Sequence, residues 1–223
     1  MNPIDFIAGV FSIVIIDLVL AGDNAILIGM AARNIPNGKR KRVILYGTIG
    51  AVVIRVCSTF AFVYLLKIPG LLFAGGLILA WISYKLLIDE NNPSIKSSRN
   101  VFAAVRTIII ADAIMGLDNV LAVAGAAHGS YLLVAIGLTI SIPIMVWGST
   151  FILKLMDRFP AIIFIGAAIL AWTSAKMIVK EPFMQPYFQE DWFTYSFEVL
   201  FIALVIFLGF MSRRTRRKEH YAR

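Results

Sequence analysis

The chain has 223 residues, of which 60% are hydrophobic and only 15% are charged. Because soluble domains carry about 25% charged residues, this composition excludes an ordinary water-soluble domain and predicts an all-α integral membrane protein. The net charge of +8 does not indicate nucleic-acid binding in so apolar a chain, and the single cysteine, Cys57, excludes a disulfide-stapled secreted module.

Seven apolar stretches follow one another along the chain, separated by short polar connections. Each is long enough to cross a bilayer core of about 30 Å as a helix. We therefore predict seven transmembrane helices, at roughly 6–29, 43–66, 71–88, 101–125, 131–153, 160–179 and 195–212.

The basic residues predict the orientation of these helices. Sixteen of them lie in alternate connections and in the tail that begins at Arg213, and only three lie on the opposite side. Short cytoplasmic segments are enriched in Lys and Arg, so we predict an N-out, C-in protein of the bacterial plasma membrane. The basic tail is then a topology signal, and the expected partner is the lipid bilayer, with no nucleic acid.

An internal repeat divides the chain. Residues 17–27 match residues 112–122 at an offset of 95, and residues 75–85 match residues 166–176 at an offset of 91. A unit of three helices enters the membrane from the opposite side when it is repeated, which predicts an inverted repeat of the kind found in transporters. The predicted units are a first three-helix repeat (1–90), a second, inverted repeat (91–181), and a seventh helix with a basic cytoplasmic tail (182–223).

Four acidic residues lie within the apolar stretches, two in each repeat. A carboxylate at the bilayer centre costs about 3 kcal/mol on insertion scales, and intramembrane acids usually mark a transport path. An asparagine lies seven residues after the first acid of each motif, on the same helical face. The candidate metal site is Asp17, Asp23, Asn24, Asp112, Asp118 and Asn119.

These side chains offer only oxygen ligands, which suit hard divalent cations such as Mn²⁺, Mg²⁺ and Ca²⁺. Gly22 and Gly116 precede the second acid of each motif, so we expect the helix to unwind there and to free backbone carbonyls. No prosthetic group is expected, since the metal would be the transported substrate. Four carboxylates around one divalent cation leave a net charge of −2, which predicts exchange of the metal for protons.

Arg55 lies midway along the second apolar stretch and has no counterpart in the other repeat. An arginine at this depth is expected to pair with an acid. We predict that it is a counter-charge which pairs with one of the aspartates and keeps the empty site neutral.

The two motifs, Asp17…Asp23-Asn24-Ala25 and Asp112…Asp118-Asn119-Val120, resemble those of the TerC family of integral membrane proteins, which is related to the LysE-type exporters. The resemblance covers nearly the whole chain. It implies efflux of manganese, in some members supply of metal to exported proteins, and a transport site formed by the six residues named above.

Two other functions stay open. One is export of amino acids or small organic cations, and the other is an intramembrane aspartate-dependent enzyme. The paired Asp-Asn motifs fit ligation of a cation better than acid–base catalysis, so we expect no enzyme. The sequence also leaves open contacts with secretion machinery or with further copies of the chain.

Overall fold

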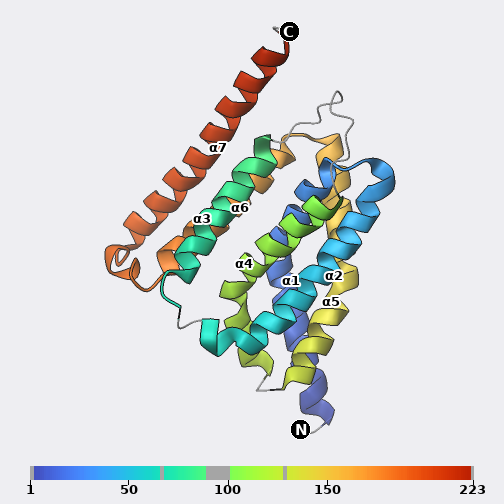
Figure 1. The fold of residues 1–223 in the computed structure, drawn as a ribbon. Coiled ribbons are helices and arrows are strands. Elements are labelled where there is room, and N and C mark those ends of the chain that lie inside the picture. Colours follow the sequence, from blue (N-terminus) through green and yellow to red (C-terminus); the bar gives the residue numbers. More distant parts are fainter. Residues whose placement is uncertain (1–2, 66–67, 89–100, 128–129, 222–223) are drawn as a thin grey trace.

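The computed structural model describes residues 3–65, 68–88, 101–127 and 130–221 (Figure 1). Within these ranges the chain forms seven long α-helices and a short 3₁₀ helix, and no strand. In chain order they are α1 (Pro3–Arg33), α2 (Asn37–Leu65), α3 (Leu71–Ile88), α4 (Val101–Ala127), α5 (Tyr131–Arg158), α6 (Ile162–Lys180), η1 (Gln185–Tyr187) and α7 (Asp191–Tyr221). The all-α prediction is confirmed.

Successive helices run in opposite directions through the bundle, so that the two termini lie at opposite ends (Figure 1). The most extensive helix contacts join α1 to α5, α2 to α4, and α3 to α6. Each of these pairs takes one helix from each predicted repeat. The last helix, α7, lies at the edge of the bundle against α6 and α3.

Five described helical segments are long and apolar enough to cross a membrane. They are Asn37–Ala61, Leu71–Ile88, Leu132–Arg158, Ile162–Lys180 and Asp191–Arg213. The two parts of α1, Phe6–Val19 and Ala21–Arg33, make a sixth candidate if they are taken as one bent span. The chain is therefore a multi-pass membrane protein, whereas seven spans and the N-out orientation stay predictions.

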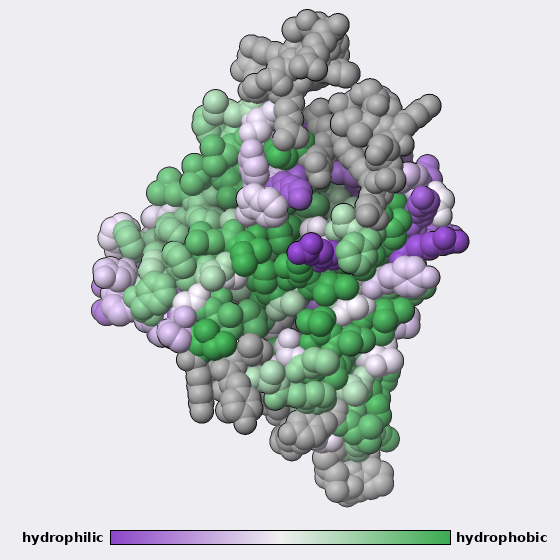
Figure 2. All heavy atoms as spheres, in the orientation of Figure 1, coloured by the Kyte–Doolittle hydropathy of each residue, from purple (hydrophilic) through white to green (hydrophobic). Residues whose placement is uncertain are grey.

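The surface of the bundle is apolar. Large hydrophobic side chains are strongly exposed, among them Val19 at 77%, Trp147 at 74% and Phe102 at 71%. The face in Figure 2 is hydrophobic over most of its middle, and strongly hydrophilic side chains gather mainly in its upper half. Exposed apolar area of this extent is unfavourable in water and suits contact with lipid chains.

Two reciprocal hydrogen bonds join α3 and α6. The Ser83 hydroxyl donates to the Ala167 carbonyl at 2.8 Å, and the Ser174 hydroxyl donates to the Gly76 carbonyl. The repeat offset of 91 residues relates Ser83 to Ser174 and Gly76 to Ala167, so the two hydrogen bonds are equivalent. The matching sequences therefore make matching contacts with each other.

The unwinding predicted at Gly22 and Gly116 was wrong, since α1 and α4 remain helical through both residues. Glycine permits opening of a helix but does not force it, and an intact helix satisfies its own backbone groups away from water. In α1 the chain instead bends by 52° between Val19 and Ala21. Asp17 and Asp23 consequently lie on opposite sides of a bend.

Candidate cation site

A buried arginine joins the first acids of the two repeats. Arg55, on α2, donates from Nη1 to Oδ1 of Asp17 on α1 and from Nη2 to Oδ1 of Asp112 on α4, the second contact measuring 2.6 Å. Asp17 and Asp112 occupy equivalent positions of the repeat. The three charges therefore bring both repeats together at one point.

The triad formed by Asp17, Arg55 and Asp112 is almost completely removed from solvent. The exposed fractions are 0% for Asp17, 2% for Arg55 and 1% for Asp112. Arg55 thus pairs with two acids rather than the one that the sequence predicts, and its role as the counter-charge of a cation site stays a prediction. Two carboxylates and one guanidinium leave a formal charge of −1 in a region of low dielectric.

Several polar atoms of the triad lack a hydrogen-bond partner. Asp17 Oδ2, Asp112 Oδ2 and Arg55 Nε are buried and make no hydrogen bond within the described part of the chain. A buried polar group without a partner costs about 1–3 kcal/mol. The carboxylates thus retain oxygen atoms that could accept further contacts.

The packing of α2 against α4 positions the arginine. Gly116 on α4 lies behind its side chain, where an added Cβ would stand 3.7 Å from Arg55 Nε. Met115, the neighbouring soft side chain, is buried in the hydrophobic core, as expected for a packing residue. The motif glycine of α4 therefore lies next to the Arg55 side chain.

The second acid of the first motif has hydrogen-bond partners other than Arg55. Asp23 is half-buried, and its Oδ1 accepts a hydrogen bond from the Asn24 backbone N–H at 2.9 Å. Its Oδ2 lies 3.4 Å from the Thr173 hydroxyl on α6, a long hydrogen bond. Asp23 is thus oriented by its own helix and by the last helix of the second repeat.

The asparagines differ between the two motifs. Asn24 is completely buried, whereas Asn119 is half-buried. The side chain of Asp118 lies outside the described residues, although its backbone continues α4. Within the described part, no three Asp, Glu, His or Cys side chains gather as ligands for one metal. The six-residue metal site therefore stays a prediction.

Glu198 is a buried acid that the repeat pattern did not reveal. It lies on α7, is 8% exposed, and accepts a hydrogen bond from Trp172 Nε1 at 2.7 Å. The ammonium of Lys176 lies 3.6 Å from the Trp172 ring centroid, and Lys85 lies 4.9 Å from Trp81 in the other repeat. Because α7 belongs to neither repeat, only its charge within an apolar stretch could have drawn attention to Glu198.

A second missed acid, Glu181, ends α6 and caps the start of α3. Its carboxylate accepts hydrogen bonds from the backbone N–H groups of Gly70 at 2.8 Å, Leu72 at 3.0 Å and Phe73 at 3.3 Å. Glu181 is only 2% exposed. A carboxylate satisfies the free N–H groups and favours the positive end of the helix dipole, so this acid joins the two repeats structurally.

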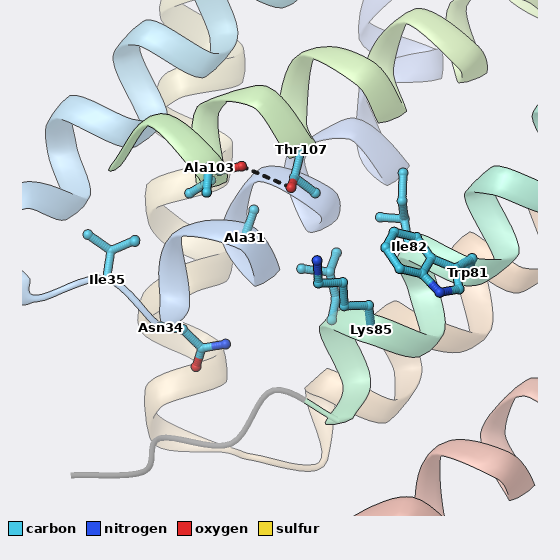
Figure 3. A pocket seen from close by; sticks show the side chains of 10 residues that line it. Ala31, Asn34, Ile35, Trp81, Ile82, Lys85, Ala103 and Thr107 are labelled. Carbon is cyan, nitrogen blue, oxygen red and sulfur yellow. Dashed lines mark hydrogen bonds between the residues drawn. The ribbon is translucent and has the colours of Figure 1, made fainter. Parts of the chain in front are cut away.

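A cavity of about 190 Å³ opens elsewhere in the bundle, between the C-terminal parts of α1 and α3 and the start of α4. Figure 3 shows the Lys85 side chain among its lining residues, with Asn34 to its left and the Thr107 hydroxyl donating to the Ala103 carbonyl. Its lining includes none of the six predicted ligands. The charged group in its lining is the Lys85 ammonium, which repels cations, so the cavity is poorly suited to a metal cation.

The family model described as integral membrane protein TerC family matches residues 3–217. The uncharacterized membrane protein YjbE of Bacillus subtilis is 46% identical over 178 residues, which cover 79% of this chain and 82% of YjbE. YkoY of the same organism is 25% identical, covering 71% of this chain and 56% of YkoY. YegH of Escherichia coli is 23% identical, covering 78% of this chain but only 37% of YegH. No solved structure matches the chain.

Proposed function

Since the chain belongs to the integral membrane protein TerC family, we propose that it is a transporter that exports a divalent cation, with Mn²⁺ as the expected cargo. Relatives in Bacillus subtilis and Escherichia coli support a place in the bacterial plasma membrane. The proposal includes seven spans with the N-terminus outside. It also assigns the protein no enzymatic activity.

We propose that the two three-helix units form an inverted repeat. The reciprocal contacts of Ser83 and Ser174 support this. The helix contacts also support it, because the first helix of each unit packs on the second helix of the other, α1 on α5 and α4 on α2. The alternating directions of the helices in Figure 1 also agree with it, because α1 and α4 run in opposite directions. In transporters, an inverted repeat forms the substrate site where its two units meet.

The convergence of Asp17 and Asp112 on one buried point is the observation that carries the proposal. These are equivalent acids of the two units, and each keeps an oxygen without a hydrogen-bond partner among the described residues. A hard divalent cation needs several such oxygens. The remaining ligands in the proposal are Asp23, Asn24, Asp118 and Asn119.

We further propose that protons return in exchange for the metal. Moving a charge across the membrane potential costs about 2.3 kcal/mol per elementary charge per 100 mV, and two returning protons would balance a divalent cation. Proteoliposomes with an imposed pH gradient test this step. Metal flux that does not respond to the gradient would contradict it.

The triad also bears on the two alternatives. An aspartyl enzyme needs two carboxyls in direct reach of each other, but the guanidinium of Arg55 lies between Asp17 and Asp112. The same geometry gives some support to an organic cation as cargo, since a guanidinium already fits between the acids. Competition of guanidinium ion with Mn²⁺ for transport would favour that second candidate.

The function is tested by measuring cell-associated manganese in a strain that lacks its manganese exporters. We expect the wild-type protein to lower the manganese content, and Asp17→Asn and Asp112→Asn to abolish this effect. Asp157→Asn is the matched control, because Asp157 is 43% exposed and pairs with Arg40 away from the triad. Unchanged manganese with the wild type would refute the proposed cargo, and full activity of both Asn variants would refute the site.

A further inference from the structure

The position of Arg55 has a consequence for how a cation reaches the two acids. One guanidinium contacts both Asp17 and Asp112, and all three residues are buried. A divalent cation coordinated by both carboxylates needs its oxygens at about 2.0–2.6 Å. Since Arg55 donates to Oδ1 of each acid, a cation bound to both carboxylates would stand beside the guanidinium, and the two positive charges would repel each other in this buried place.

We infer that Arg55 is a tethered competitor of the cargo: it occupies the site between Asp17 and Asp112 when no cation is bound, and it leaves at least one of them when a cation binds. This inference rests on the proposed function, whose site it deepens. It makes Arg55 a specificity-determining residue. Only a cation that contacts the acids better than a guanidinium does can displace it.

The surroundings of the side chain allow such an exchange. Asp17 Oδ2 and Asp112 Oδ2 make no hydrogen bond in the described part of the chain, so a cation has free oxygens to approach. Arg55 Nε also lacks a partner there, and Gly116 beside it carries no side chain. The hydrogen bonds that the guanidinium makes in the described part of the chain are therefore the two that a cation would replace.

A purely structural arginine predicts the opposite effect on binding. If Arg55 only held the acids in place, its removal would disorder them and weaken binding of a cation. If it competes with the cargo, its removal frees two carboxylates and strengthens binding. The sign of the change in affinity distinguishes the two roles.

Titration of the purified full-length protein with Mn²⁺ tests the inference, because the electron paramagnetic resonance signal of free aqueous Mn²⁺ disappears on binding. We expect Arg55→Gln to bind Mn²⁺ at least about tenfold more tightly than the wild type, since a buried positive charge has been removed from the site. Arg40→Gln is the matched control, as Arg40 pairs with Asp157 elsewhere, and it should leave the affinity unchanged.

Arg55→Lys covers the case in which the Gln variant does not yield folded protein. Lysine keeps the charge but cannot bridge two carboxylates as a planar guanidinium does, so a smaller tightening is expected. If the wild type binds Mn²⁺ and a folded Arg55 variant binds it equally well or more weakly, the inference is overturned while the proposed function stands. Absence of Mn²⁺ binding in the wild type and in both Arg55 variants overturns the proposed function and the inference with it.

Discussion

Removal of Arg55 should destabilise the protein more than removal of either acid that it contacts. Substitution of Asp17 or Asp112 by Asn leaves one guanidinium facing one carboxylate, a neutral pair. Arg55→Gln leaves two buried carboxylates facing each other without a positive charge between them. The two kinds of variant therefore differ in the charge that remains buried.

The magnitudes follow from the contacts. Each Asp→Asn change weakens one hydrogen bond to a charged group, which is worth about 1.5–3 kcal/mol. Breaking a buried ion pair so that a charge stays uncompensated costs about 3–5 kcal/mol. Because the triad residues are at most 2% exposed, solvent cannot take over the lost contacts. We expect Arg55→Gln to exceed each Asp→Asn change by about 1–3 kcal/mol.

The free energy of unfolding can be compared in detergent, with all variants measured at one pH and without divalent cations. Arg40→Gln removes a partly exposed ion pair, worth at most about 1 kcal/mol, and two hydrogen bonds to the backbone carbonyls of Arg33 and Ile35. It is the control for loss of an arginine that leaves no buried carboxylate without a partner. If Arg55→Gln were no less stable than Asp17→Asn and Asp112→Asn, the positive charge of Arg55 would not be what stabilises the two buried carboxylates.

Three further predictions concern the contacts that support the site. Glu181→Ala removes the acceptor of three backbone N–H groups at the start of α3 and should cost about 1–3 kcal/mol in unfolding free energy; no loss would show that water replaces the cap. Gly76→Ala should destabilise the α3–α6 contact by about 1–3 kcal/mol, because the new Cβ would lie 2.9 Å from the Ser174 carbonyl oxygen, whereas Gly125→Ala meets nothing within 4 Å and should be tolerated. Glu198→Leu should shift the fluorescence of Trp172 by removing the acceptor of its indole N–H, while Glu198→Gln keeps an acceptor and should leave the emission near that of the wild type.

The sequence predicts the helical architecture well because its signals are long. A run of 18 or more apolar residues satisfies its backbone groups away from water by forming a helix, so the starts of α3, α4 and α5 could be predicted to the residue. The start of α2 and the end of α7 lie six and nine residues outside the predicted stretches, because these helices continue into polar sequence. The local geometry at Gly22 and Gly116 could not be predicted, since glycine permits unwinding of either helix without requiring it. Whether a helix opens depends on the partners that its freed carbonyls would find.

The candidate site was predictable where its residues repeat and not where they do not. Asp17 and Asp112 are recognisable as a pair from the repeat alone, and their convergence agrees with it. Arg55 has no repeat partner, so its contact with one acid could be expected but its contact with both depends on the packing of α2 against α4. Glu198 lies on α7, outside both repeats, and its role at Trp172 depends on where that helix docks.

The pairing of helices restricts how such a site could open. The most extensive contacts join α1 to α5 and α2 to α4, so each tightly packed pair contains one helix from each repeat. A movement of one whole repeat against the other would break both pairs at once, whereas a movement between the pairs would keep them. Arg55 and Asp112 lie within one pair, and Asp17 lies in the other. We therefore expect the Arg55–Asp17 contact to separate first when the bundle changes conformation, which leaves the arginine on Asp112 and frees Asp17 for the incoming cation.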